Sequence, residues 1–132
     1  MANQELNCFQ INLQHSCTAT SNLVHLINQH RIDVAFIQET YTIRNQLAGI
    51  PKIFRTYTYG NDRSRAAVII SNKDIDATTI TQISDKDCIA IEIKYNGKTF
   101  YGAACILTQM KTLKEIYRKW KICYITPMET AY

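Results

Sequence analysis

Hydrophobic and polar residues follow two different repeats in the first forty positions. Between residues 7 and 13 they alternate, which is typical of a half-buried strand. Ser16 or Thr18 can then cap a helix by accepting a hydrogen bond from a free backbone N–H. The apolar run at residues 34–37 suits a strand buried on both faces. The pattern therefore predicts a strand, a helix and a second strand. The helix residues that recur at helical spacing on one face are Leu23, Leu26, Ile27 and His30.

From residue 54 onward the pattern changes to short strands in succession. Asn96-Gly97 is the strongest hairpin signal in the chain, because both residues tolerate a positive φ. Other turn residues separate the remaining runs. We expect a meander of antiparallel strands after the opening unit. The expected strands are residues 54–59, 66–71, 77–83, 88–95 and 99–107.

The last segment has the pattern of an amphipathic helix. Thr112 and Glu115 form a capping box, and apolar residues from Leu113 to Trp120 share one face. The opposite face is basic. A solvated polar surface is the more common explanation of such a face, and phosphate binding is the other. The basic residues are Lys111, Lys114, Arg118, Lys119 and Lys121.

Composition indicates one small globular domain. The chain has 132 residues, of which 46% are hydrophobic and 20% charged, enough for a single core. Its net charge of +4 is compatible with a polyanionic partner but falls short of a DNA-packaging protein. No basic segment precedes an apolar run at the N-terminus, and no apolar stretch approaches the roughly 20 residues that span a bilayer. We expect an intracellular protein, nuclear or cytoplasmic, without a signal peptide or a membrane partner.

The five cysteines include no Cys-x-x-Cys pair, and their odd number favours reduced thiols over a disulfide framework. Cys8, Cys88 and Cys105 fall in predicted strands, where a buried thiol behaves as a small apolar side chain. No recognised zinc-ligand spacing connects the remaining candidates, which are His15, Cys17, His25 and His30.

Two polar residues stand where the first two predicted strands end. Asn12 closes the first strand, and Glu39 follows the second. Adjacent parallel strands bring their carboxyl ends to one edge of a sheet, where ligands collect in open α/β folds. A carboxylate there can bind Mg²⁺ while the metal keeps its waters, and a nearby amide can orient a phosphate. Taken alone this signal is weak, since a glutamate after a buried strand is more often a solvated loop residue.

Four stretches of the chain occur in a distinctive order. They are FQINLQHS at residues 9–16, DVAFIQET at 33–40, RSRAAVIIS at 63–71 and SDKDCIAIEI at 84–93. In order and spacing they resemble successive motifs of the endonuclease domain of non-LTR, jockey-like retrotransposons, within the endonuclease/exonuclease/phosphatase superfamily. The resemblance covers about residues 6–107, and this part of the chain is similar to the N-terminal half of that domain.

The resemblance implies an α/β (α+β) fold, a truncated half of a two-sheet α/β sandwich at residues 1–107, followed by a divergent helix and tail at 108–132. It also implies a Mg²⁺ or Mn²⁺ cofactor, DNA as the partner, and nicking of one DNA strand to leave a 3′-hydroxyl that primes reverse transcription. Residue by residue, Glu39 matches the metal-binding carboxylate and Asn12 the active-site asparagine. The residues that match DNA-facing segments are Gln14, His15, Arg63 and Arg65.

The chain departs from the family in its second half. The family's strand tyrosine falls at Cys105 or Ile106, neither of which can donate a phenolic hydrogen bond to phosphate. The family's Gly-Asp-Phe-Asn segment and its final Ser-Asp-His triplet, which activate and orient the attacking water, do not occur; Ser84-Asp85-Lys86 belongs to a different motif. Because such residues act as a unit, we expect a fragment that is inactive or nearly inactive alone, and whose half of the metal site need not hold the cation by itself.

Two other hypotheses remain open at this point. The chain could be a competent phosphodiesterase that another fragment or a second copy completes. It could instead be a non-catalytic module that binds nucleic acid through its Lys and Arg residues, with strong salt dependence and no sequence preference. Because most of the second sheet is expected to be missing, an uncovered apolar sheet face would also favour self-association.

Overall fold

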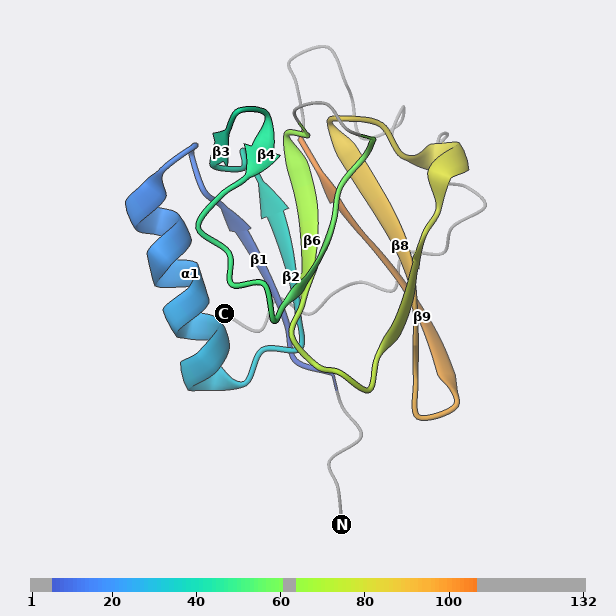
Figure 1. The fold of residues 1–132 in the computed structure, drawn as a ribbon. Helices are drawn as coiled ribbons and strands as arrows, with labels where there is room; N and C mark the ends of the chain where they lie inside the picture. The colour runs from blue at the N-terminus through green and yellow to red at the C-terminus, as the bar shows by residue number, and fades with distance from the viewer. Residues whose placement is uncertain (1–5, 61–63, 107–132) are drawn as a thin grey trace.

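The computed structural model describes residues 6–60 and 64–106 and forms two packed β-sheets with one α-helix in this part of the chain (Figure 1). The first sheet has the strand order β1-β2-β6-β5 and the second the order β7-β8-β9, while β3 and β4 form a separate small hairpin. The bounds are β1 Cys8–Asn12, α1 Cys17–His30, β2 Val34–Gln38, β3 Thr42–Ile43, β4 Gln46–Leu47, β5 Arg55–Tyr57, β6 Ala66–Ile70, β7 Asp76–Thr79, the 3₁₀ turn Thr81–Ile83, β8 Cys88–Tyr95 and β9 Lys98–Cys105.

The opening strand–helix–strand unit is confirmed. β1 and β2 pair in parallel, with Asn12 opposite Gln38. Ser16 caps α1, since its Oγ accepts a hydrogen bond of 3.1 Å from the backbone N–H of Ala19. The helix stops at Arg31, whose φ of 51° is left-handed and whose N–H bonds back into the last turn. Local capping therefore sets both ends of the helix that lies against the sheet.

Both faces of the first sheet are covered (Figure 1). On one face α1 packs Leu23 and Ile27 against Ile37 of β2. On the other face Phe36 and Val68 are buried against the second sheet. The central strands β2 and β6 are thus enclosed on both sides, which explains their continuous apolar sequences.

The expectation that most of the second sheet is missing is wrong in one respect. Within residues 6–60 and 64–106, strands β7 to β9 form an antiparallel sheet whose Ile89, Ile91 and Ile93 pack on the first sheet. The expected meander is also divided, because β5 and β6 join the first sheet and only β7 to β9 form the second. The face from which we expected self-association is therefore buried, and that argument for self-association loses its basis.

The strand expected at residues 77–83 is shorter than its apolar pattern suggests. It ends at Thr79, and the chain continues as a 3₁₀ turn. The hydroxyl of Ser84 donates to the carbonyl of Ile80 at 2.7 Å and accepts from the N–H of Ala90 at 3.0 Å. The Ser84 side chain thus forms the hydrogen bonds at the point where the backbone pairing of β7 ends, and the chain turns there.

The hairpin of β3 and β4 was not expected. Its two-residue turn is Arg44-Asn45, with φ of 54° and 64°. Two consecutive left-handed residues match the twist of a two-residue hairpin, and Asn-Gly is the usual sequence for it. The sequence contains no such signal here, because the two turn residues are Arg44 and Asn45 and neither is glycine.

The hairpin of β8 and β9 forms as expected, with Asn96 and Gly97 at φ of 50° and 74°. Its register places Cys88 opposite Cys105, with Cα atoms 4.0 Å apart, and a disulfide joins the two. The expectation of reduced thiols is therefore wrong for this pair. The odd cysteine count could not show that two of the five residues would be direct cross-strand neighbours.

The thiol of Cys8 is expected to be unreactive. Burial raises the pKa of Cys8 to about 11, and the nearby Asp33 carboxylate adds to the effect. Because the thiolate is the nucleophile, iodoacetamide near pH 8 should alkylate the exposed Cys17 at least about tenfold faster than Cys8. Peptide mass spectrometry after timed alkylation measures both rates. Equal rates in the folded chain would contradict this expectation, and equal rates in concentrated urea are the control.

Several expectations fall on residues outside those described. They include Arg63, the boundary between residues 107 and 108, and the amphipathic helix around residues 112–120. Within the described ranges, no helix combines the length and apolar character that crossing a membrane requires. Nuclear or cytoplasmic location remains a prediction.

Candidate active site

The predicted site residues meet at the sheet edge where β1 and β2 end. The N–H of Leu13 donates to the carbonyl of Gln38, and the N–H of His15 donates to the carbonyl of Glu39, each at 2.9 Å. The loops that follow the two strands therefore run side by side. Together with the parallel register, these bonds bring the backbones of Asn12 and Glu39 to neighbouring positions.

Asn12 holds the first of these loops. Its Oδ1 accepts a hydrogen bond of 2.8 Å from the backbone N–H of Gln14. This bond closes a tight turn in which Gln14 and His15 both have left-handed φ, 50° and 57°. Since the amide oxygen serves the turn, the Nδ2 group of the exposed Asn12 is the atom suited to donate to a ligand, such as a phosphate oxygen.

Glu39 has a strained backbone. Its φ of 50° lies in the left-handed region, which costs a residue with a side chain about 1–2 kcal/mol. The bond from His15 to its carbonyl and a longer bond of 3.4 Å from the N–H of Thr40 to the carbonyl of Arg65 hold this conformation. Strained residues gather at active sites, where the surrounding structure enforces them. Glu39 shares this left-handed φ with Gln14 and His15, so three residues at this one edge have it.

His15 is fixed in orientation at the same edge. Its Nδ1 lies 3.0 Å from the carbonyl oxygen of Thr40. A carbonyl only accepts hydrogen bonds, so Nδ1 must carry the proton of this bond. In the neutral ring Nε2 is then an acceptor. His15 therefore offers a defined acceptor at the exposed end of the loop beside Glu39.

Two buried polar residues complete the support of the site, and sequence reasoning missed both. The hydroxyl of Thr40 donates to the carbonyl of Ser64 at 2.6 Å, and the hydroxyl of Ser64 donates to the carbonyl of Ala66 at 2.6 Å. These bonds join the end of β2 to the start of β6. The only available signal was the position of Thr40 directly after Glu39.

Replacing Thr40 by valine is expected to lower the free energy of unfolding by about 1–3 kcal/mol, because it leaves the buried carbonyl of Ser64 without its donor. Urea denaturation followed by circular dichroism measures the loss. Thr78→Val, the same change at an exposed position of β7, is the matched control. Equal stability of the two variants would show that the Thr40 hydroxyl contributes nothing.

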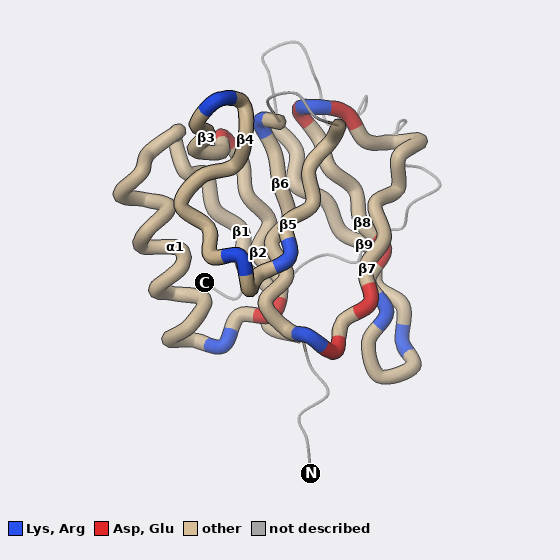
Figure 2. Tube along the Cα trace, in the orientation of Figure 1, with Lys and Arg blue, Asp and Glu red and all other residues tan. Residues whose placement is uncertain are grey.

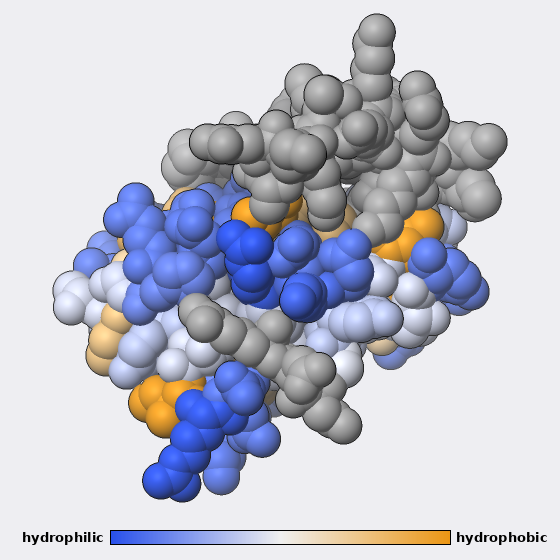
Figure 3. Space-filling model, turned by 90° about the horizontal axis from the view of Figure 1, so that it is seen from above, coloured by the Kyte–Doolittle hydropathy of each residue, from blue (hydrophilic) through white to orange (hydrophobic). Residues whose placement is uncertain are grey.

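Arg65 connects the two sheets at this edge. Its Nη1 lies 3.3 Å from Oδ1 of Asp87, and its backbone N–H donates to the carbonyl of Lys86 at 2.7 Å. The Arg65 side chain is 37% exposed, so the ion pair adds little stability and part of the guanidinium faces solvent. Charges of both signs lie along the edge (Figure 2), and hydrophilic residues form a band across it when it is viewed from above (Figure 3).

Five of the six predicted site residues therefore share one edge of the sheet: Asn12, Gln14, His15, Glu39 and Arg65. The sixth, Arg63, is not among the described residues. Their roles in binding metal or DNA remain predictions.

Few side chains at this edge can bind a metal ion. In the described part of the chain, no group of three or more His, Cys, Asp and Glu residues is arranged to hold a metal ion. Glu39 nevertheless carries carboxylate oxygens of the kind that Mg²⁺ takes, and Mg²⁺ often binds through one or two carboxylates while keeping its waters. The residues fit such a cation, but one carboxylate alone would hold it weakly.

The expected place of the family's tyrosine contains no hydroxyl. Cys105 is part of the disulfide, and Ile106 is buried with its N–H bonded to the carbonyl of Asp87 at 2.8 Å. Neither residue can replace a phenol as a donor to phosphate. This departure from the family pattern holds in the folded chain.

Neither a protein-family model nor a curated protein sequence matches the chain. Among solved structures, the endonuclease domain of TRAS1, a telomere-specific non-LTR retrotransposon, superimposes with a TM-score of 0.71 at 20% identity, covering 89% of this chain and 52% of that one. An endonuclease/exonuclease/phosphatase family protein from Leptotrichia buccalis has a TM-score of 0.58 at 12% identity, covering 91% and 62%.

A third similar structure is D. rerio TDP2 complexed with single-strand DNA product, with a TM-score of 0.56 at 13% identity and coverage of 91% and 53%. The chain thus spans about half to three fifths of the length of the structures it matches. At these identities the likeness concerns the fold. The resemblance suggested by the four sequence motifs is confirmed at that level: the chain has a partial endonuclease/exonuclease/phosphatase fold, shared with a retrotransposon endonuclease domain.

Proposed function

We propose that the chain is the metal-holding and DNA-facing part of a retrotransposon-type endonuclease, which nicks one DNA strand to leave a 3′-hydroxyl for reverse transcription. The observation that carries this proposal is the meeting of Asn12 and the strained Glu39 at one sheet edge. The shared fold supports it, because the same edge collects ligands in α/β sheets.

In this proposal the residues have separate tasks. The carboxylate of Glu39 supplies oxygen ligands to Mg²⁺ or Mn²⁺. The Nδ2 group of Asn12 donates to an oxygen of the scissile phosphate. Gln14 and the exposed part of Arg65 contact neighbouring phosphates and hold the strand in place. His15 accepts a hydrogen bond through its Nε2 from a donor of the DNA, such as a base amino group. The bound cation would polarise a phosphoryl oxygen and stabilise the charge that develops during cleavage.

We further propose that these 132 residues do not complete the reaction by themselves. The sequence contains neither the Gly-Asp-Phe-Asn segment nor the Ser-Asp-His triplet of the family, and no tyrosine stands at residues 105 and 106. Without these groups nothing in the described chain activates the attacking water. Any substantial activity would require the same chemical groups from another source.

Paramagnetic broadening by Mn²⁺ tests the metal site directly. In an isotope-labelled chain, substoichiometric Mn²⁺ should broaden the amide signals of residues 12–15 and of Glu39 and Thr40 before others. Glu39→Gln should remove this broadening, because an amide is a far poorer ligand than a carboxylate. Glu92→Gln, on β8, is the matched control and should leave the broadening unchanged. Equal broadening in the original chain and in Glu39→Gln would overturn the proposal.

The alternative of a non-catalytic nucleic-acid-binding module rests on the basic residues between 111 and 121. These residues lie outside the described part of the chain. No described contact therefore favours that function over the proposed one.

A further inference from the structure

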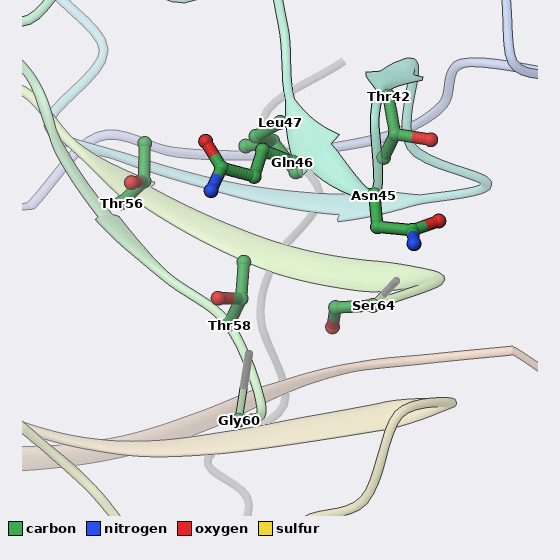
Figure 4. A pocket seen from close by; sticks show the side chains of 8 residues that line it. All are labelled: Thr42, Asn45, Gln46, Leu47, Thr56, Thr58, Gly60 and Ser64. Carbon is green, nitrogen blue, oxygen red and sulfur yellow. The ribbon is translucent and has the colours of Figure 1, made fainter. Parts of the chain in front are cut away.

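A polar pocket of about 350 Å³ opens between the β3–β4 hairpin and the strand β5 with its continuation (Figure 4). The hairpin supplies one wall, and β5 with the residues after it supplies another. Ser64, which lies just before β6, closes one end. This volume lies at the small end of the range of ligand sites, about 300–1,000 Å³. The lining residues are Thr42, Asn45, Gln46, Leu47, Thr56, Thr58, Gly60 and Ser64.

The lining favours a neutral ligand with several hydrogen-bonding groups. It contains hydroxyl and amide groups, which both donate and accept, and no charged side chain among the described residues. A phosphate would call for guanidinium or ammonium partners inside the pocket. The edge of a nucleobase instead carries neutral donors and acceptors that amides and hydroxyls match, and Leu47 adds an apolar contact for its flat face.

Among the residues that the structure describes, two arginines adjoin the pocket lining and neither belongs to it. Arg44 precedes Asn45 at the exposed hairpin turn, and Arg65 follows Ser64. Each nucleotide in a strand has a neutral base and charged phosphates on both sides. The described lining is polar and uncharged, and an arginine adjoins two parts of it, which matches one nucleotide of a strand with the base inside and the phosphates outside.

The pocket is also close to the candidate active site along the chain. Thr42 follows Glu39 by three residues, which at full extension span at most about 10 Å. The bond from Thr40 to Ser64 further ties the residue after Glu39 to the pocket lining. An occupant of the pocket would thus be within one or two nucleotides of a phosphate held at Glu39.

We propose that this pocket binds the unpaired base of a nucleotide that neighbours the cleaved phosphate. The base must be unpaired because a paired base hides its hydrogen-bonding edge, and extrusion from a duplex costs energy that an already single-stranded base does not require. The proposal deepens the proposed function, on which it depends for the position of the phosphate. The pocket chemistry itself is independent of any metal.

Titration of the isotope-labelled chain with deoxythymidine and deoxyadenosine 5′-monophosphates tests the proposal, with a chelator present to exclude divalent cations. The amide signals of Thr42, Gln46 and Thr58 should shift, whereas deoxyribose 5-phosphate, which lacks a base, should leave them in place. Thr58→Val should raise the Kd roughly five- to tenfold through the loss of one hydrogen bond. Thr79→Val, an equally half-buried threonine on β7, should not change it.

Gln46→Leu at an exposed position is the second pocket variant, in case Thr58→Val perturbs folding. Equal shifts with deoxyribose 5-phosphate would make this a phosphate site and overturn the proposal, as would the absence of shifts or an unchanged Kd in both variants. Because no metal is present, this result is separate from Mn²⁺ broadening at Glu39. Nucleotide binding without Mn²⁺ binding would uphold the pocket and overturn only the proposed function.

Discussion

Gly102→Val is expected to remove a large part of the chain's folding free energy. Gly102 lies in β9, and a Cβ added there would lie 2.6 Å from Cζ and 2.8 Å from Cε1 of Phe36. Phe36 is 1% exposed and lies in the core between the two sheets, so its ring cannot move out into solvent. Overpacking usually costs about 1–3 kcal/mol, and valine adds two further methyl groups, so we expect a loss of about 4 kcal/mol or more. That approaches the whole stability of a small domain, about 5–15 kcal/mol.

Thermal denaturation followed by circular dichroism measures this effect as a strongly lowered or lost cooperative transition. Gly97→Ala in the β8–β9 turn is a control, because its Cβ would meet no atom within 4 Å and only its φ of 74° opposes the change. That control should cost about 1 kcal/mol. A second variant, Phe36→Leu combined with Gly102→Val, should recover part of the loss, because the two sites are in contact and their effects are not additive. A normal transition in Gly102→Val would show that the two sheets pack differently.

The chain alone is expected to nick supercoiled plasmid in Mg²⁺ no faster than its Glu39→Gln variant. Catalytic groups that act as a unit lose nearly all activity when one is removed, so the rate should fall roughly 10⁴-fold or more below that of a complete domain of this fold. Gel electrophoresis of the relaxed plasmid over time measures the rate. The Glu39→Gln variant, purified in parallel, reports any contaminating nuclease.

Nicking that Glu39→Gln abolishes would contradict this expectation. It would mean that the missing acid–base groups are supplied either by other residues of the chain or by a second copy of it. A rate that rises with the square of the chain concentration would then identify a second copy as the source, and a linear dependence would place the groups within one chain.

The opening unit could be predicted because its signals are local. Alternation in β1, helical spacing in α1 and the cap at Ser16 each involve residues a few positions apart. The meeting of Asn12 and Glu39 then follows from the parallel arrangement of two strands joined by a helix. Half of the candidate site was thus available from the sequence by physical reasoning, and the resemblance gave these two residues their proposed roles.

The remaining features depend on contacts between distant residues. β6 is buried on both faces, so its apolar sequence could not reveal that it pairs with β2 rather than with a later strand. The bond between Thr40 and Ser64 spans 24 positions, and the disulfide of Cys88 and Cys105 depends on the register of a hairpin. The nucleotide-sized pocket needs a turn at Arg44-Asn45 that contains no glycine.

The connection from β2 to β6 is long, yet none of the fully buried apolar residues of the described chain lies in it. Among its described residues only Thr40 and Ser64 are buried, and the hydroxyl of Thr40 donates to the carbonyl of Ser64. Apart from β5, which belongs to the first sheet, the described part of this connection consists of turns and the small β3–β4 hairpin. Such segments can change in length at small entropic cost, because the closure penalty grows slowly with length. Insertions and deletions between β2 and β5 are therefore expected to leave the two packed sheets in place.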